Sequence, residues 1–481
     1  MSISLPERAT AGYFDDAAAS PVPLARPLDE LRALLALAIP LSVANLAQVM
    51  IGAVDTAIVG RLGAVELGGA GLGNTLYFTV SVVGMGIMLG LDPLVAQAAG
   101  AREPDRSRRF KWQAVWLALF FALPLTVIVL LAGGLLERAG IEPAAAQAAR
   151  QYLQGRVPGL VPCLLFVGFR SCLQAENTTR PIVVGALLAN VVNLVVGWLL
   201  AFGDRGLIEL GLPAVGMEAY GVRGAAWAGT LATVVQALVL ALVLFRAPAH
   251  EPRSVRLFEP RLLLRALALG TPIGLQMLAE FGVFGVVTVL AGNIGSLSLA
   301  GHQVAITFAS ASFMIPVAIG AAASVRVGRA VGGGDGSAAR RAGWMSIALG
   351  VLFMGFAALL FVIAPDALAA VVTDQPEVVA AAVPLLAVAA VFQLSDGAQA
   401  VALGALRGAG DTRFPLLANL AGHYLVGLPI GVLLAFHFDL GARGLWWGLS
   451  AGLTAVALGL ILRFAELTSR PMTPAVGRGA L

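Results

Sequence analysis

One carboxylate, Glu280, lies near the middle of an apolar stretch, 271–295, that is long enough to cross a lipid bilayer. An acid at the centre of a bilayer costs about 2.5 to 3.5 kcal/mol on insertion scales, so it normally faces a bundle interior or a water-filled space. Gln276 lies one helical turn before Glu280 and Thr288 lies two turns after it, so the three share one helix face. The sequence therefore predicts a functional polar stripe on this helix.

Polar residues at helical spacing interrupt other apolar stretches of the chain. These candidate site residues are Asn45, Gln48 and Asp55 in one stretch, Asn190 and Asn193 in a second, Gln303 in a third, and Gln393, Asp396 and Gln399 in a fourth. If Glu280 and Asp396 lie near one another, they cannot both stay charged without a neutralising cation. We therefore predict an exchange site at these two acids, which bind either Na⁺ or H⁺, with Asp55 as a further coupling acid and the amides lining a substrate cavity.

The composition identifies the elements that must hold these residues. Hydrophobic residues make up 59% of the 481 positions and charged residues only 12%, far from the roughly one quarter that is usual in soluble proteins. The chain is thus predicted to be an all-α membrane protein with twelve transmembrane helices. Their expected limits are 33–60, 72–99, 112–134, 147–169, 181–202, 222–245, 264–292, 299–325, 342–364, 378–405, 414–436 and 443–464.

The basic residues predict the orientation of these helices. With both termini on the cytoplasmic side, the cytoplasmic segments hold 24 of the 31 Lys and Arg residues, and the bias alternates from loop to loop. Short loops that stay in the cytoplasm carry such an excess of positive charge. The high pI thus reflects membrane topology, and the scattered arginines give no support for nucleic-acid binding.

An internal repeat divides the chain into two lobes. A shift of 232 positions superposes Pro40 on Pro272, Gly60 on Gly292 and Gly100 on Gly332 without a gap. Six helices followed by six that enter from the same side make a parallel repeat, as in transporters whose lobes enclose a central site. The expected divisions are a cytoplasmic tail 1–30, an N lobe 31–245, a cytoplasmic linker 246–263, a C lobe 264–465 and a C-terminal tail 466–481.

Several motifs, in the same order and at matching spacing, resemble the multidrug and toxic compound extrusion (MATE) family of cation-coupled exporters. They are VDTAIVGRLG at 54–63, AGHQVAITFASASFMIPVAIGAAASVRVG at 300–328, LSDGAQAVALGALRGAGDTRFP at 394–415, and Glu280 after TPIGLQMLA. The resemblance covers roughly residues 31–464 and is strongest for the NorM-like branch.

This resemblance implies an antiporter that exports organic, often cationic, compounds while Na⁺ or H⁺ moves inward by alternating access. The two acids of the NorM-like cation site match Glu280 and Asp396, with Gln303 close by, and the helix-one acid of the family matches Asp55. Phe313 occupies a helix-eight position that is Tyr in some members. Where the DinF-like branch has an Asp four residues after Asn193, this chain has Gly197.

Other classes of protein fit the sequence less well. A flippase for lipid-linked precursors shares the two-lobe plan, but is expected to line its cavity with several Arg or Lys residues, which here fall mainly in loops. An intramembrane enzyme is the more remote alternative, because no HExxH or GxSxG motif is present. We expect a monomer of the inner membrane that needs no cofactor besides its coupling ion and binds no nucleic acid.

Overall fold

The computed structural model describes residues 27–246, 256–472 and 474, and helices without any strand make up this part of the chain. Twelve of its helical spans are long and apolar enough to cross a membrane, which confirms the predicted fold class. The elements are α1 (Pro27–Gly60), α2 (Ala64–Leu89), α3 (Leu91–Gly100), α4 (Pro104–Gly134), α5 (Pro143–Arg156), η2 (Val157–Gly159), α6 (Leu160–Ala175), α7 (Arg180–Phe202), α8 (Asp204–Glu209), α9 (Gly221–Leu244), α10 (Pro260–Ile294), α11 (Ser296–Gly333), α12 (Gly336–Ile363), α13 (Pro365–Val372), α14 (Pro376–Ala409), α15 (Arg413–Leu420), η4 (Ala421–Gly427), α16 (Leu428–Val432), η5 (Leu433–His437) and α17 (Gly441–Ser469). Most of the predicted terminal tails and half of the predicted linker lie outside the described residues.

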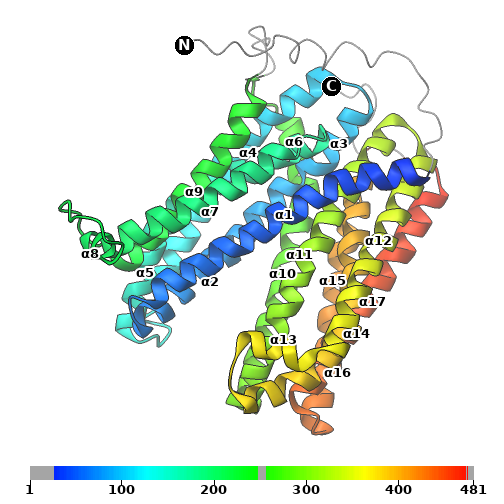
Figure 1. Ribbon diagram of the computed structural model, residues 1–481. Helices are drawn as coiled ribbons and strands as arrows, with labels where there is room; N and C mark the ends of the chain where they lie inside the picture. The colour runs from blue at the N-terminus through cyan, green and yellow to red at the C-terminus, as the bar shows by residue number, and fades with distance from the viewer. Residues whose placement is uncertain (1–26, 247–255, 473, 475–481) are drawn as a thin grey trace.

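The two groups of six spans form lobes that diverge from a shared region of contact (Figure 1). That region lies toward the end of the molecule where α1 begins and α17 ends, here called the basic end. The first half of α1 packs on the C lobe, since Leu34 and Leu37 belong to one core cluster with Ile319 of α11. Its second half packs within the N lobe, where Ile58 joins Val222 of α9.

The first helix of the C lobe repeats this arrangement. Leu262 and Ala266 at the start of α10 belong to the main N-lobe cluster, whereas Val283 and Val287 belong to the C-lobe core. Each lobe therefore begins with a long helix whose first half lies against the other lobe. The repeat found in the sequence thus has a structural counterpart.

Glycines allow the helices of the two lobes to approach closely at the basic end. A Cβ added at Gly86 of α2 would fall 2.2 Å from the Gly274 Cα of α10. A Cβ at Gly100 of α3 would fall 2.0 Å from the Arg329 oxygen of α11, and one at Gly332 would fall 2.0 Å from the Gln97 oxygen. Small residues of this kind let membrane helices pack backbone to backbone, which is where van der Waals contact between them is greatest.

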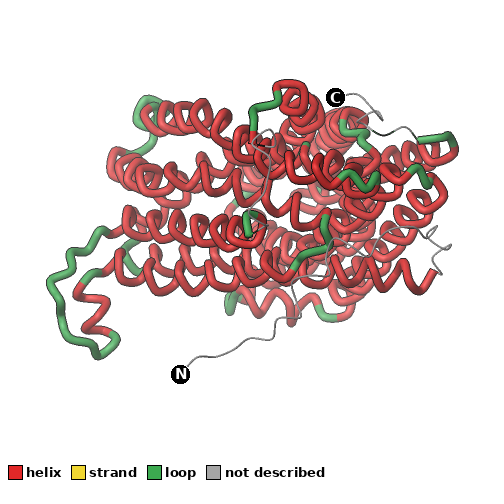
Figure 2. Tube along the Cα trace, turned by 90° about the horizontal axis from the view of Figure 1, so that it is seen from above, coloured by secondary structure: helices red, strands yellow, loops and turns green. Residues whose placement is uncertain are grey.

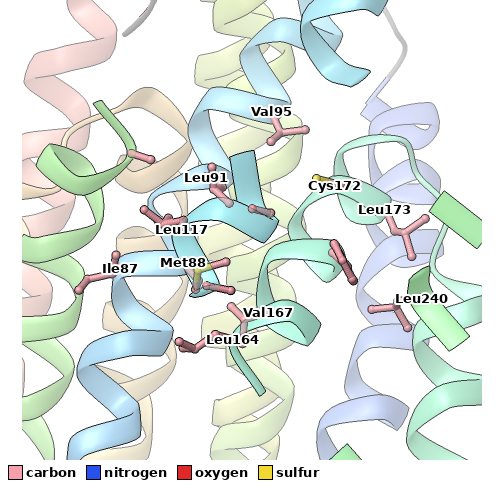
Figure 3. Packing of buried hydrophobic residues seen from close by; sticks show 14 of the residues in the cluster. Ile87, Met88, Leu91, Val95, Leu117, Leu164, Val167, Cys172, Leu173 and Leu240 are labelled. Atoms are coloured by element: carbon pink, nitrogen blue, oxygen red, sulfur yellow. The ribbon is translucent and has the colours of Figure 1, made fainter. Parts of the chain in front are cut away.

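A core of branched and sulfur-containing side chains holds the N lobe around the break between α2 and α3 at Gly90. Figure 3 shows Met88 and Leu91 from either side of this break close to Leu117 of α4 and Leu164 of α6. All four side chains are buried. Because lipid tails are as apolar as leucine, this core stabilises the lobe through close packing and not through removal of water.

Two spans depart from regular α-helix near the proposed sites. The fourth span is interrupted by the 3₁₀ turn η2, whose middle residue, Pro158, cannot donate a backbone hydrogen bond. The eleventh contains two π-helical segments, η4 and η5, on either side of Pro429 in α16. Such irregularities are common at functional positions of helices.

The connection between α7 and α9 carries the short helix α8 and projects on the left in Figures 1 and 2. Asp204 holds this connection, since its carboxylate accepts hydrogen bonds from the backbone N–H groups of residues 215–217. These bonds lower the pKa of Asp204. At the other end of the molecule Asp335 caps α12 by accepting from the Ala338 N–H at 2.8 Å.

Candidate functional site

The carboxylate of Glu280 is held by side-chain amides from three helices of the C lobe. Gln276, one turn earlier on α10, donates to Glu280 Oε2 at 2.9 Å. Gln399 of α14 donates to Oε1 at 3.2 Å, and Asn419 of α15 donates to Oε2 at 3.3 Å. The acid therefore lies inside the bundle, and the side chains that hydrogen-bond to it are neutral amides.

Asp396 of α14 is the second acid of this region, and it is 5% exposed. Its charge and that of Glu280 are close enough to repel each other. Within the described residues no Lys or Arg nitrogen lies within 4.0 Å of either carboxylate, and Asp396 has no hydrogen-bond partner. The structure thus brings together the two acids that the sequence singled out; the guanidinium of Arg407 acts on Glu280 only from beyond ion-pair distance.

The amides around these acids leave their oxygen atoms unused. Four of them are buried, and their oxygens have no hydrogen-bond partner in the part of the chain that the structure describes: Gln276 Oε1, Gln393 Oε1, Gln399 Oε1 and Asn419 Oδ1. An unpaired acceptor in a protein interior is costly, so a cluster of them marks a place that a cation or donor can occupy. No group of three or more His, Cys, Asp or Glu side chains in the described residues could hold a metal ion, so the oxygen donors here are two acids and neutral amides.

Gln393, Phe313 and Gln303 make no hydrogen bond with Glu280 or Asp396 in the described structure. Gln393 donates to the Ser312 hydroxyl of α11, which leaves its oxygen unpaired. Phe313 is half-buried, and the Gln303 side chain is exposed and makes no hydrogen bond with either carboxylate in the described structure. Its neighbour His302 is buried instead, with Nε2 3.0 Å from the Thr288 hydroxyl.

Asp55 of α1 occupies the interior of the N lobe. The buried Asn193 of α7 donates to Asp55 Oδ1 at 2.7 Å and to the Ile51 oxygen at 3.3 Å. Two turns earlier, Gln48 accepts from Gln236 of α9 at 2.8 Å. The polar stripe predicted on this helix therefore connects α1 with α7 and α9, although Gln48 itself keeps an exposed surface.

Asn45 belongs to a different place, the contact between the lobes. Its amide donates to the Met314 oxygen of α11 at 3.1 Å, and its oxygen accepts from Arg170 of α6 at 3.2 Å. Nearby, Asp92 of α3 lies 3.8 Å from Arg407 of α14. An ion pair thus joins the lobes at the basic end.

Two candidate functional residues, Asn419 and Arg156, were not predicted from the sequence. Asn419 contacts Glu280, and a lone amide in the apolar run 414–436 was the signal that could have found it. Arg156 lies within the predicted limits of the fourth span, 147–169, but was not singled out from the sequence; in the structure its guanidinium lies 5.0 Å from the Tyr77 ring centroid. Counting charges by segment cannot separate a loop arginine from one that faces inward.

Comparison with known proteins identifies the family. The MatE family model matches residues 40–199 and 272–433, which are corresponding parts of the two lobes. A probable multidrug resistance protein NorM of Bradyrhizobium diazoefficiens is 36% identical over 460 residues, 94% of this chain and 96% of that protein. One from Brucella suis is 37% identical over 439 residues, 88% of this chain and 90% of its own length.

Solved structures show the same fold at lower identity. The eukaryotic MATE transporter AtDTX14 superposes with a TM-score of 0.80 at 22% identity, over 94% of this chain and all of its own. A structure described as the outward-facing conformation of a multidrug resistance MATE family transporter gives 0.80 at 19% identity, over 92% and 96% of the two chains. With two six-helix lobes and a buried pair of acids in the second, the chain belongs to the MatE family and is a membrane transporter of the NorM-like multidrug efflux class.

Proposed function

We propose that the protein is a secondary antiporter that exports small organic cations in exchange for inward Na⁺, with Glu280 and Asp396 as the cation-binding carboxylates. The observation that carries this proposal is the set of four buried amide oxygens without partners beside the two acids. Hard cations bind several carboxylate and carbonyl oxygens at once, whereas a proton satisfies a single acceptor. The donor set therefore favours Na⁺ over H⁺, its alternative.

Competition for the same negative charge couples the two fluxes. A pair of carboxylates in a low-dielectric interior is strongly destabilised when both are ionised, and any bound positive charge relieves this. Na⁺ and an organic cation can each supply that charge, so binding of one weakens binding of the other. Exchange follows if the site opens to one side of the membrane at a time.

The contacts between the lobes support such alternating access. They include the glycine approaches of α2 with α10 and of α3 with α11, and the ion pair of Asp92 with Arg407, all at the basic end. The excess of Lys and Arg predicts that this end faces the cytoplasm. The conformation described is then closed toward the cytoplasm, and separation of these contacts would open the site to it.

The stoichiometry decides which gradient drives export. One-for-one exchange of monovalent cations moves no net charge, so the Na⁺ concentration gradient alone supplies the free energy. A second Na⁺ per cycle adds about 2.3 kcal/mol for each 100 mV of membrane potential. Transport currents distinguish these two cases.

The test is efflux of a cationic dye from proteoliposomes under an imposed Na⁺ gradient or pH gradient, applied separately. We expect the Na⁺ gradient to drive transport in the wild type, and Glu280→Gln and Asp396→Asn to lose at least nine tenths of the rate. The matched control is Glu137→Gln, because Glu137 is a surface acid paired with Arg150 at 2.6 Å. Export by both site variants at the wild-type rate would refute the assignment, and a response to the pH gradient alone would make H⁺ the ion.

The proposed oligomeric state and membrane location follow from the same site. We propose a monomer in the inner membrane with cytoplasmic termini, because a single pair of lobes already provides the complete site. A lipid-precursor flippase fits less well: the interior of the N lobe contains Arg156, but the C-lobe site is acidic, and phosphate recognition calls for several cations.

A further inference from the structure

Arg156 lies in the interior of the N lobe and has no part in the proposed cation site of the C lobe. It is the last residue of α5, directly before the 3₁₀ turn that interrupts the fourth span. Its Nη1 lies 3.3 Å from the Thr233 hydroxyl of α9, and its guanidinium lies over the ring of Tyr77 of α2. Elements from three parts of the lobe therefore surround one positive charge at membrane depth, where an ionisable residue is rarely structural.

This guanidinium has no direct ionic partner. Among the described residues, no carboxylate oxygen lies within 4.0 Å of it, and its Nε is buried without an acceptor. The Tyr77 hydroxyl, in a side chain only 4% exposed, is also buried without a partner. Two strong hydrogen-bond donors in neighbouring side chains thus lack an acceptor, and the one Arg156 does have is a long bond to a neutral hydroxyl.

Asp55 is the nearest acid, and the side chains of Asp55 and Arg156 both lie next to Gly229 of α9. The Cβ that an alanine would add there falls 2.9 Å from Arg156 Nη1 and 3.5 Å from Asp55 Oδ2. Asp55 Oδ1 accepts from Asn193, and Oδ2 accepts no hydrogen bond from any described residue. Both side chains are half-buried, so each keeps some accessible surface. One positive and one negative group therefore lie close together without forming a direct pair.

We propose that these residues form a zwitterion-binding subsite in the N lobe, in which Arg156 and Tyr77 bind a carboxylate of the exported compound and Asp55 binds its cationic group. A planar guanidinium matches a carboxylate with two parallel hydrogen bonds, and the tyrosine hydroxyl supplies a third donor. A ligand with both charges leaves the region neutral, as it is when empty. A purely cationic ligand would instead meet an uncompensated arginine, so the subsite discriminates between the two.

This subsite is separate from the C-lobe carboxylates, and its role in export rests on the proposed function above. Binding of a zwitterion at the subsite does not depend on that function. A compound bound here would contact α1, α2, α5 and α9, whereas Glu280 and Asp396 lie on α10 and α14. The two sites can therefore be tested independently.

The experiment compares two dyes that differ by one methyl ester. Rhodamine 110 carries a free carboxylate beside its cationic ring system, and rhodamine 123 is its methyl ester and is only cationic. Binding of each to the purified full-length protein is measured by fluorescence anisotropy without any ion gradient. We expect the wild type to bind the acid at least fivefold more tightly than the ester.

The variants assign this preference to the subsite. Arg156→Gln should reduce the ratio of the two affinities to about one, Tyr77→Phe should reduce it in part, and Arg156→Lys should retain part of it, because charge remains while the paired hydrogen bonds are lost. Arg150→Gln on the same helix is the control and should leave the ratio unchanged, since Arg150 pairs with Glu137 at the surface. Glu280→Gln changes only the C-lobe site and should therefore leave the ratio unchanged as well.

Two results would overturn the inference: equal or weaker binding of the acid by the wild type, or an unchanged ratio in Arg156→Gln. A purely structural role for Arg156 predicts equal loss for both dyes. If Arg156→Gln does not fold, as judged by size exclusion and thermal unfolding, the wild-type ratio and Tyr77→Phe still decide. Dye export under a Na⁺ gradient is measured separately, so a failure of the antiport proposal leaves this binding result interpretable.

Discussion

Replacing Gly332 by alanine should push the lobes apart at the basic end. The new Cβ would fall 2.0 Å from the backbone oxygen of Gln97 and 2.6 Å from its carbonyl carbon. Both are main-chain atoms of α3, so no side chain can rotate away. Because carbon and oxygen normally meet at well over 3 Å, α3 and α11 must separate by roughly 1 Å or more.

The cost of this separation can be set against the transport cycle. Overpacking of a well-packed contact destabilises it by about 1 to 3 kcal/mol. In the alternating-access scheme proposed above, this overpacking destabilises the conformation that is closed at the basic end and leaves the stability of the conformation that is open there unchanged. The population ratio of the two should therefore shift by a factor of about 5 to 150. Gly100→Ala, at the repeat-related position, should act in the same way because its Cβ meets the Arg329 oxygen at 2.0 Å.

The assay is hydrogen–deuterium exchange on peptides that cover α3 and the second half of α11, combined with dye efflux. Both variants should exchange faster in these peptides and export more slowly. Gly134→Ala is the control, because its added Cβ would meet nothing within 4 Å. Wild-type exchange and efflux in both Gly332→Ala and Gly100→Ala would refute the reasoning that these glycines hold the lobes together.

Three further predictions concern other parts of the structure. Asp92→Asn should lower the thermal midpoint because it leaves Arg407 buried without its partner, and adding Arg407→Gln should recover part of the loss; no recovery would mean that the pair is not coupled. The lowered pKa of Asp204 means that it stabilises its connection above the usual aspartate pKa of about 3.9 and loses this effect as pH falls through the lower folded value. The protection factors of the amides of residues 215–217, which correct for the intrinsic pH dependence of exchange, should therefore fall at low pH in the wild type and should already be low in Asp204→Asn. Trp446→Ala should cost about 3 to 5 kcal/mol in thermal or denaturant unfolding, because this fully buried ring packs on Phe392; a loss below 1 kcal/mol would contradict that packing.

Much of the fold could be predicted because hydrophobic length is a local property. Each span needs about 20 apolar residues whatever surrounds it, so all twelve were located from composition alone. Irregular helices were not predicted. The break at Gly90 and the π-helical turns of the eleventh span depend on how neighbouring helices pack. A run of apolar residues does not indicate where such irregularities occur.

The two acids of the C lobe were identifiable from sequence, because a carboxylate in an apolar helix is rare and costly wherever that helix lies. Their partners were identifiable only in part. Gln276 shares a helix with Glu280 and follows from spacing, whereas Asn419 reaches the same carboxylate from a span 139 residues further on.

Sequence alone determined that this chain crosses a membrane twelve times, that it repeats itself, and that it buries negative charge. Tertiary structure decided which polar residues meet. It placed Asn45 between the lobes and not beside Asp55, and left Arg156 in the N lobe without an acid among the described residues within 4.0 Å. The physical reason is that insertion into lipid depends on the composition of each helix by itself, whereas the pairing of polar groups depends on the rotation and contact of helices far apart in the chain.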